Sequence, residues 1–146
     1  MGAEKLLNTM IYIINKALYN LMGDTSKTIS RISSKYLMDY LISQKITESK
    51  ENEIGEEELR KIVIEDLGLC DDYKLYEDGE YIILEIINPV VKECLIQLNR
   101  ENIPIVLSPD KIFMYMLCRI HNYKAIYKEV EYDEENNKVI WKCKKL

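Results

Sequence analysis

Two side chains that could hold a metal ion lie one helical turn apart in the second half of the chain. Cys118 and His121 are three positions apart, which would put both on one face of a helix. A thiolate and an imidazole form half of a zinc site, and Cys143 or Cys94 could add a sulfur ligand. The competing interpretation is a buried Cys118 beside a half-exposed His121 that ends its helix. Zinc is therefore a possible cofactor, and nothing in the pattern requires one.

The other sequence signatures of enzymes are absent. There is no G-x-G-x-x-G, no Walker-type phosphate loop, no H-E-x-x-H and no G-x-S-x-G. His121 is the only histidine, so a nucleophile–His–acid triad would depend on that residue alone. These observations favour a protein that is not an enzyme.

The cysteines and the hydropathy predict a cytoplasmic location. The four cysteines are widely spaced, without a C-x-x-C pair, and are typical of reduced, buried thiols. No apolar run approaches the roughly 18 residues that span a bilayer, and the first 21 residues lack the features of a signal peptide.

Composition excludes further classes. The chain has 146 residues, of which 47% are apolar and 31% charged, so it can build a core and is neither collagen-like nor disordered. Its net charge of −5 is a poor match for nucleic acid. The acidic excess lies in residues 47–80, which carry thirteen acidic and four basic side chains.

One predicted strand, 81–87, is apolar on both faces. Ile82, Leu84 and Ile86 point to one side, whereas Ile83 and its alternating neighbours point to the other. We expect one face to meet the helices of this chain and the other to be covered by a partner subunit or an apolar cavity. Glu85 in that setting needs a hydrogen-bonding partner or a raised pKa.

Periodicity and turn residues predict a single α+β domain with a helical layer packed on an antiparallel sheet. It would comprise a helical pair (1–46), an acidic linker with a short helix (47–70), and the sheet with its helices (71–146). Helices are expected at 3–22, from Asp24 or Thr25 to 45, and at 56–67, 89–99 and 109–121. Hairpins are expected at 73–87 and 124–145.

The patterns also predict which side chains are buried. The first helix should bury one broad face that contains Leu6, Leu7, Met10, Ile11, Ile14, Ala17, Leu18 and Leu21. The second should turn to the core Ile29, Ile32, Tyr36, Leu37, Tyr40 and Leu41. In the last hairpin Tyr132 should face Val139 and Val130 should face Trp141, with Ile126 continuing the apolar side.

This order of elements resembles the 4-vinyl-reductase domain family, small-molecule-binding modules related to transport-particle subunits of the Golgi. The resemblance lies in Leu21-Met22-Gly23-Asp24, Ile86-Ile87-Asn88-Pro89, the helix 112–120 and the closing strand 139–143. Relatives carry glycines in the last helix and a Gly-x-x-x-Cys ending that can bind zinc, and this chain has neither. The resemblance therefore implies a shared apolar, hydrocarbon-binding pocket rather than a shared metal site.

The leading prediction is a sensory or ligand-binding homodimer that holds a small apolar molecule between helices and sheet. The expected ligand-binding residues are Tyr36, Tyr40, Met114, Tyr115, Leu117, Cys118 and Trp141. One alternative is an interaction or scaffold protein with a filled core. Another is a zinc-stabilised domain with Cys118, His121 and Cys143 as ligands, or a zinc-dependent enzyme that uses Cys118, His121 and Glu85.

Overall fold

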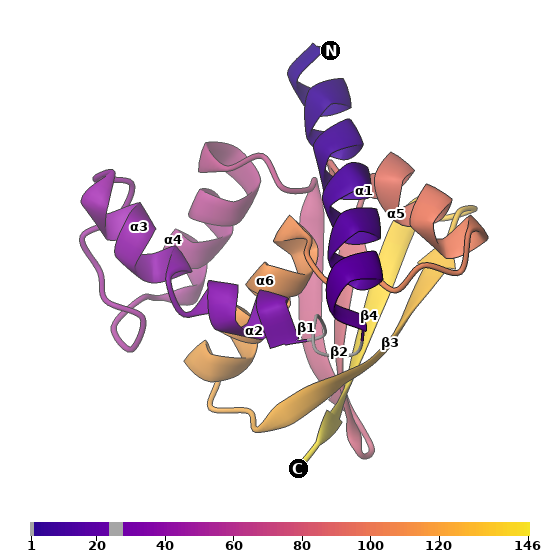
Figure 1. The fold of residues 1–146 in the computed structure, drawn as a ribbon. Helices are drawn as coiled ribbons and strands as arrows, with labels where there is room; N and C mark the ends of the chain where they lie inside the picture. Colours follow the sequence, from indigo (N-terminus) through magenta and orange to yellow (C-terminus); the bar gives the residue numbers. More distant parts are fainter. Residues whose placement is uncertain (1, 24–27) are drawn as a thin grey trace.

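The computed structural model describes residues 2–23 and 28–146 as one α+β domain (Figure 1). The helical elements are α1 (Gly2–Met22), α2 (Ile29–Ser34), α3 (Leu37–Ser43), α4 (Glu56–Arg60), the π-helix η2 (Lys61–Asp66), α5 (Lys92–Arg100) and α6 (Pro109–Ile120). The strands are β1 (Asp72–Asp78), β2 (Tyr81–Ile87), β3 (Ala125–Asp133) and β4 (Lys138–Lys145). They form one antiparallel sheet in the order β1-β2-β4-β3, which confirms the predicted fold class.

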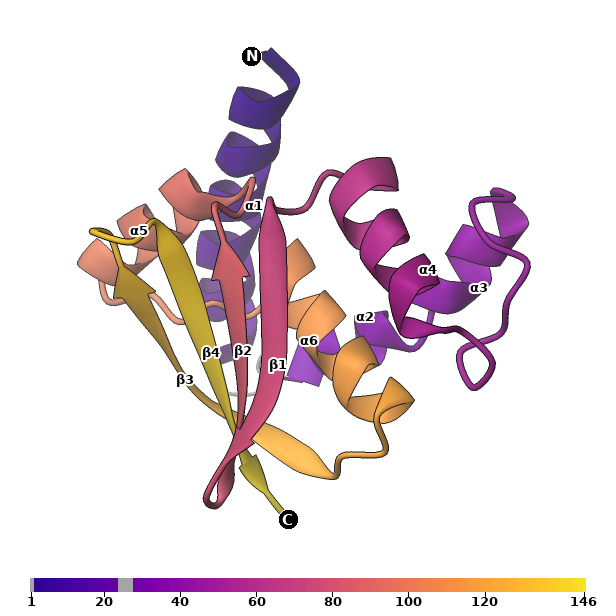
Figure 2. The same ribbon diagram turned by 180° about the vertical axis from the view of Figure 1, so that it is seen from behind.

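The described helices all lie on one side of the sheet. Figure 2 shows the four strands in front with the helices behind them, and Figure 1 shows α1 and α2 at the opposite surface. Between these two surfaces α5 contacts α1, and α6 contacts α2. The core fills the space between α5, α6 and the inner face of the sheet, where Leu84, Ile86 and Trp141 are almost fully buried.

The C-terminal hairpin has the register that its pattern predicts. Tyr132 pairs with Val139, and Val130 pairs with Trp141. The exception is Ile126, which is 48% exposed. A bulge between Tyr127 and Glu129 shifts the register by one residue and places Tyr127 opposite Cys143 on the inner face.

The outer face of the sheet is covered by its own side chains, which corrects the expectation that a partner or cavity must cover it. Ile83 on this face is only 4% exposed although no described helix lies over it (Figure 2). Lys142, its cross-strand partner, spans towards Glu129 and Glu131, with N–O distances of 3.3 and 3.7 Å. Long lysine stems cover apolar surface while their ammonium groups stay in water, so this face can meet solvent.

Helix α1 is rotated from its predicted packing, so that only part of the predicted face, Leu7, Ile11, Ile14 and Leu18, is buried or half-buried. Asn8 and Asn15 are buried together with Ile11, whereas Leu6 and Met10 of the predicted core face are 63% and 44% exposed. The Asn15 amide donates to the carbonyl of Leu107 at 2.7 Å, and its oxygen accepts from the backbone N–H groups of residues 106 and 107. Backbone groups of the 103–108 loop therefore select polar side chains on the inner face of α1.

The second predicted helix is divided, and of its predicted core residues Leu37 and Leu41 face inward, whereas Ile32, Tyr36 and Tyr40 are exposed. Helix α2 ends at Ser34 and α3 begins at Leu37, and the buried side chains of α2 are Ser30 and Ser34. Ser30 donates to the carbonyl of Val106 at 2.7 Å, so this helix too is held by polar contacts. The predicted caps Asp24 and Thr25 lie outside the described residues, whereas Gly23 has the positive φ of +57° expected of a helix-ending glycine.

The short acidic helix begins at Glu56 as predicted but changes its winding at Lys61. Its second half is the π-helix η2, in which the Leu67 N–H bonds the Ile62 carbonyl at 2.8 Å. None of the helices within 2–23 and 28–146 combines the length and the apolar character needed to cross a bilayer.

Candidate ligand-binding pocket

An apolar pocket of about 300 Å³ lies between α6 and the helices of the N-terminal half. One wall is formed by Ile112, Phe113 and Met116 of α6. The opposite wall is formed by Leu41 of α3 together with Ile62, Val63 and Leu67 of η2, and Leu7 of α1 also contributes. Every residue that lines the pocket is apolar, and Leu67 at 46% exposure also reaches solvent.

The walls of the pocket follow from two local features. Helix α6 is apolar around most of its circumference, so it can contact the sheet on one side and leave a second apolar side for the pocket. The extra residue in each turn of η2 brings Ile62 and Val63 to the pocket while both remain almost fully buried. π-Helical turns are often found at functional sites.

The structure brings together some of the predicted ligand-binding residues, but not around this pocket. Met114, Leu117, Cys118 and Trp141 are all buried in the core between α6 and the sheet. Met114, Leu117 and Cys118 are on the side of α6 opposite Ile112 and Met116, Trp141 packs from β4, and none of the four lines the pocket. Tyr115 is half-buried beside the core and does not line it either. The prediction therefore located the right helix and the wrong side of it.

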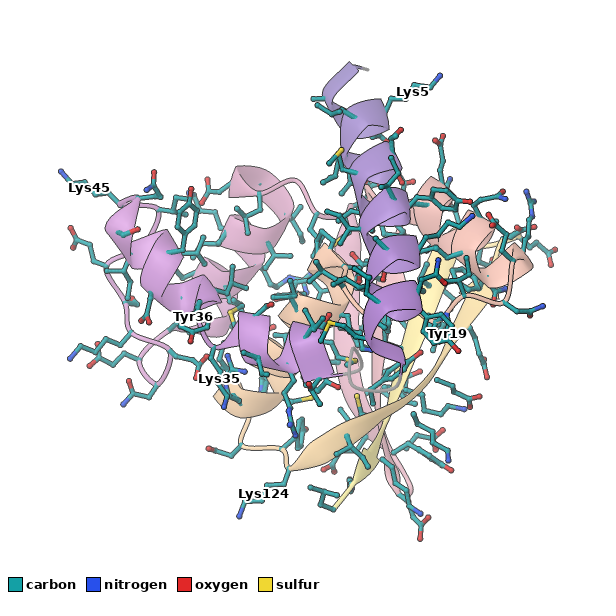
Figure 3. All side chains as sticks on the ribbon, in the orientation of Figure 1. Lys5, Tyr19, Lys35, Tyr36, Lys45 and Lys124 are labelled. Carbon is teal, nitrogen blue, oxygen red and sulfur yellow. The ribbon has the colours of Figure 1, made fainter. Side chains whose placement is uncertain are left out.

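Tyr36 and Tyr40 are surface residues rather than pocket residues. Their exposed fractions are 66% and 62%, and Figure 3 labels Tyr36 at the junction of α2 and α3. The side chains that reach the pocket from α3 are instead Leu37 and Leu41, one residue further along in each case. This one-residue offset corresponds to a rotation of the helix by about 100°.

The two cysteines of the predicted zinc set are neighbours in the core. The Cys143 thiol donates to the sulfur of Met114 at 3.2 Å, and Cys118 lies one turn after Met114 on α6. Hydrogen bonding between the two thiols lowers the pKa of Cys118 and raises the pKa of Cys143. Burial further raises the pKa of Cys143.

His121 does not join these thiols. Its Nε2 atom is 3.5 Å from a carboxylate oxygen of Glu56, and its ring stacks on Tyr123 with centroids 6.0 Å apart. Glu85 lies on the other face of the sheet, where its bond to Lys138 lowers the pKa of its carboxyl. In the part of the chain that the structure describes, no three His, Cys, Asp or Glu side chains cluster to hold a metal.

We therefore expect a metal chelator to leave stability unchanged. Thermal unfolding of the purified chain with and without EDTA should give the same midpoint, because His121 pairs with Glu56 and lies apart from the thiols of Cys118 and Cys143 in the core. A fall of several degrees on addition of EDTA, restored by zinc, would instead show that metal stabilises the fold.

The sequence analysis did not identify a buried acid, Asp110, near the start of α6. Ser108 caps this helix by accepting from the N–H of Lys111 at 3.1 Å, and Asp110 follows in the first turn. The Asp110 carboxylate is completely buried, and neither oxygen has a hydrogen-bond partner. Burial raises its pKa to about 7, and the neighbouring Trp141 indole opposes this shift only in part. An Asp after Ser-Pro is ordinary at a helix start, so no pattern indicates its burial.

Comparison with known proteins gives one informative relative. No family model matches this chain, and no solved structure matches it. The chain is 32% identical over 122 residues to a protein of Methanocaldococcus jannaschii named "Uncharacterized protein MJ0758". The matched segment is 83% of this chain and 73% of that protein. A likeness of this extent, across most of the α+β domain, shows that the chain belongs to the same protein family as MJ0758.

Proposed function

We propose that this domain is a non-enzymatic module that binds a small apolar molecule in the pocket between α3, η2 and α6. The observation that carries the proposal is a space of about 300 Å³ lined only by apolar side chains. Such a volume falls within the range of known ligand pockets, which are largely apolar. A sensory role in the cytoplasm, as a homodimer, is part of the same proposal. It agrees with what the resemblance to the 4-vinyl-reductase domain family implies.

The pocket favours a particular class of ligand. Its volume is about twice the roughly 150 Å³ of an engineered apolar cavity that binds benzene, so a two-ring aromatic or a medium-length hydrocarbon suits it. Removing the apolar surface of such a ligand from water supplies roughly 25 cal/mol per Å². The lining supplies no side-chain charge or hydroxyl to orient a polar group, so selectivity rests on shape.

A fluorescence titration tests this proposal. N-phenyl-1-naphthylamine is an uncharged probe, a phenyl ring joined through an amine to a naphthalene, and its emission rises in an apolar environment. We expect it to bind with one site per chain. Ile112→Trp should weaken its affinity at least about tenfold, because the larger side chain fills the pocket from its α6 wall.

Ile140→Trp provides the matched control. Ile140 is also half-buried, but it lies on β4 opposite Glu85, on the outer face of the sheet. This variant should bind the probe as the native chain does. Failure of the native chain to bind, or an equal loss in both variants, would contradict the proposal.

A further inference from the structure

Helices α1 and α2 carry exposed apolar side chains on their outer surfaces although buried polar side chains attach their inner surfaces to the domain. Leu6, Met10, Ile13 and Leu21 recur at spacings of three, four and eight on the side of α1 opposite its buried asparagines. The row of exposed apolar side chains continues at intervals of four through Ile32, Tyr36 and Tyr40, and the buried residues beneath it are Ser30 and Ser34 on α2 but Met38 and Leu41 on α3. We call these seven apolar side chains the outer apolar face.

The fold of one chain does not account for this face. Asn8 bridges α1 to Val90 and Cys94 with hydrogen bonds of 2.8 and 3.0 Å, so α1 is attached through its polar side. A surface helix with one polar and one apolar side usually turns its apolar side inward, because exposing apolar side chains to water is unfavourable. Here the apolar residues point away from the chain's own core, which indicates that another molecule covers them.

The size of the face matches a protein interface. Leu6 and Leu21 are 63% and 84% exposed, Tyr36 and Tyr40 are 66% and 62% exposed, and the other three are about half exposed. With about 200 Å² for each large side chain, the seven offer roughly 800 Å². A stable interface buries about 800 Å² on each partner.

The charge and shape of α1 fit a second copy of the same chain. On α1 the charged Lys16 turns away from the outer apolar face to pair with Glu101 at 3.2 Å, and the exposed charges beside the face on α2 and α3 are of both signs, Arg31, Lys35 and Asp39. A two-fold interface sets each patch against itself, so an apolar centre flanked by charges of both signs avoids self-repulsion. Both ribbon views show the first turns of α1 projecting beyond the rest of the domain, where a second helix can lie alongside (Figures 1 and 2).

We propose that the outer apolar face is the interface of a two-fold symmetric homodimer, in which α1 of one chain packs against α1 of the other. This gives the proposed homodimer a definite surface on the helical side of the molecule. It does not depend on the pocket, because none of the seven side chains lines it.

Sedimentation velocity of a matched pair of variants tests this interface. Ile13 on α1 and Ile126 on β3 are the same residue type with 50% and 48% exposure. At chain concentrations of about 10 to 100 µM, the native chain and Ile126→Glu should sediment as dimers of twice 17.3 kDa. Ile13→Glu should sediment as a monomer, because it places two carboxylates in an apolar contact.

Two further measurements make the outcome decisive. Ile13→Glu should still bind N-phenyl-1-naphthylamine, so loss of the dimer and loss of the pocket can be told apart. A native chain that stays monomeric throughout this range, or an Ile13→Glu chain that stays dimeric, would overturn the interface. Sedimentation of a monomeric native chain with phosphatidylglycerol vesicles would also overturn it and would assign the face to a lipid surface.

Discussion

Replacement of Asn15 by leucine is expected to lower the free energy of unfolding by about 3 to 6 kcal/mol. Asn15 is completely buried, and its amide satisfies the N–H groups of Val106 and Leu107 and the carbonyl of Leu107. Leucine has a similar size but satisfies none of these groups, and each backbone group left without a partner costs about 1 to 3 kcal/mol. Urea denaturation of both proteins measures the difference.

Asn20→Leu on the same helix is the control for this experiment. Asn20 is exposed, so its replacement should change stability by less than about 0.5 kcal/mol. If Asn15→Leu were as stable as the native chain, then α1 would not be attached through its polar side. The outer apolar face would then lose its structural basis.

The second large effect is a dependence of stability on pH that Asp110 causes. The pKa of this carboxyl is raised from 3.8 to about 7 in the folded chain, chiefly by burial. Below pH 4 it is protonated in both the folded and unfolded states. As the pH rises from about 4 to 7 the unfolded chain ionises first, so the folded chain loses up to about 4 kcal/mol of stability. Above pH 7 this contribution no longer changes.

Asp110→Asn should remove this slope. The amide is neutral at every pH, so the variant should gain up to about 4 kcal/mol over the native chain between pH 4 and pH 8. Any fixed cost of the substitution cancels, because only the change with pH is compared. Asp39→Asn, at an exposed position, should leave the slope as it is in the native chain. Parallel curves for the native chain and Asp110→Asn would contradict the assignment.

The C-terminal hairpin could be predicted in detail because two independent signals agree there. The turn residues 134–137 and the alternation of apolar residues specify the same pairing, which places Val130 opposite Trp141. The bulge after Tyr127 could not be predicted from the sequence. With or without the extra residue, apolar side chains of β3 still face the inner side of the sheet. The effect of the bulge was to exchange Ile126 for Tyr127 on the inner face.

The N-terminal helices show what periodicity leaves undetermined. The apolar stripe of α1 was correctly recognised as one face of a helix, but a stripe does not state which neighbour covers it. The decisive contacts are made by Asn15 and Ser30 to backbone atoms of residues 106 and 107, more than 70 positions away in the chain. Polar contacts of that kind have no local signature.

Of the pocket, the sequence analysis could predict only that the helix α6 forms one wall. The run Ile112-Phe113-Met114 continues through Met116 and Leu117, so α6 is apolar on opposite sides. This composition indicates burial on both sides and does not tell which side meets the sheet. The wall from η2 depends on a π-helical turn, and the sequence 61–66 reads equally well as ordinary α-helix.

Methyl NMR tests the pocket most directly. Spectra of the methyl-labelled native chain are recorded during titration with N-phenyl-1-naphthylamine. The account predicts that the methyl signals of Leu41, Ile62 and Met116 shift with saturation at one probe per chain, because all three line the pocket. The signals of Leu84 and Val139 on the sheet should stay nearly unchanged. Shifts confined to the sheet methyls, or to the exposed methyls of α1, would place the bound molecule elsewhere and contradict the proposed site.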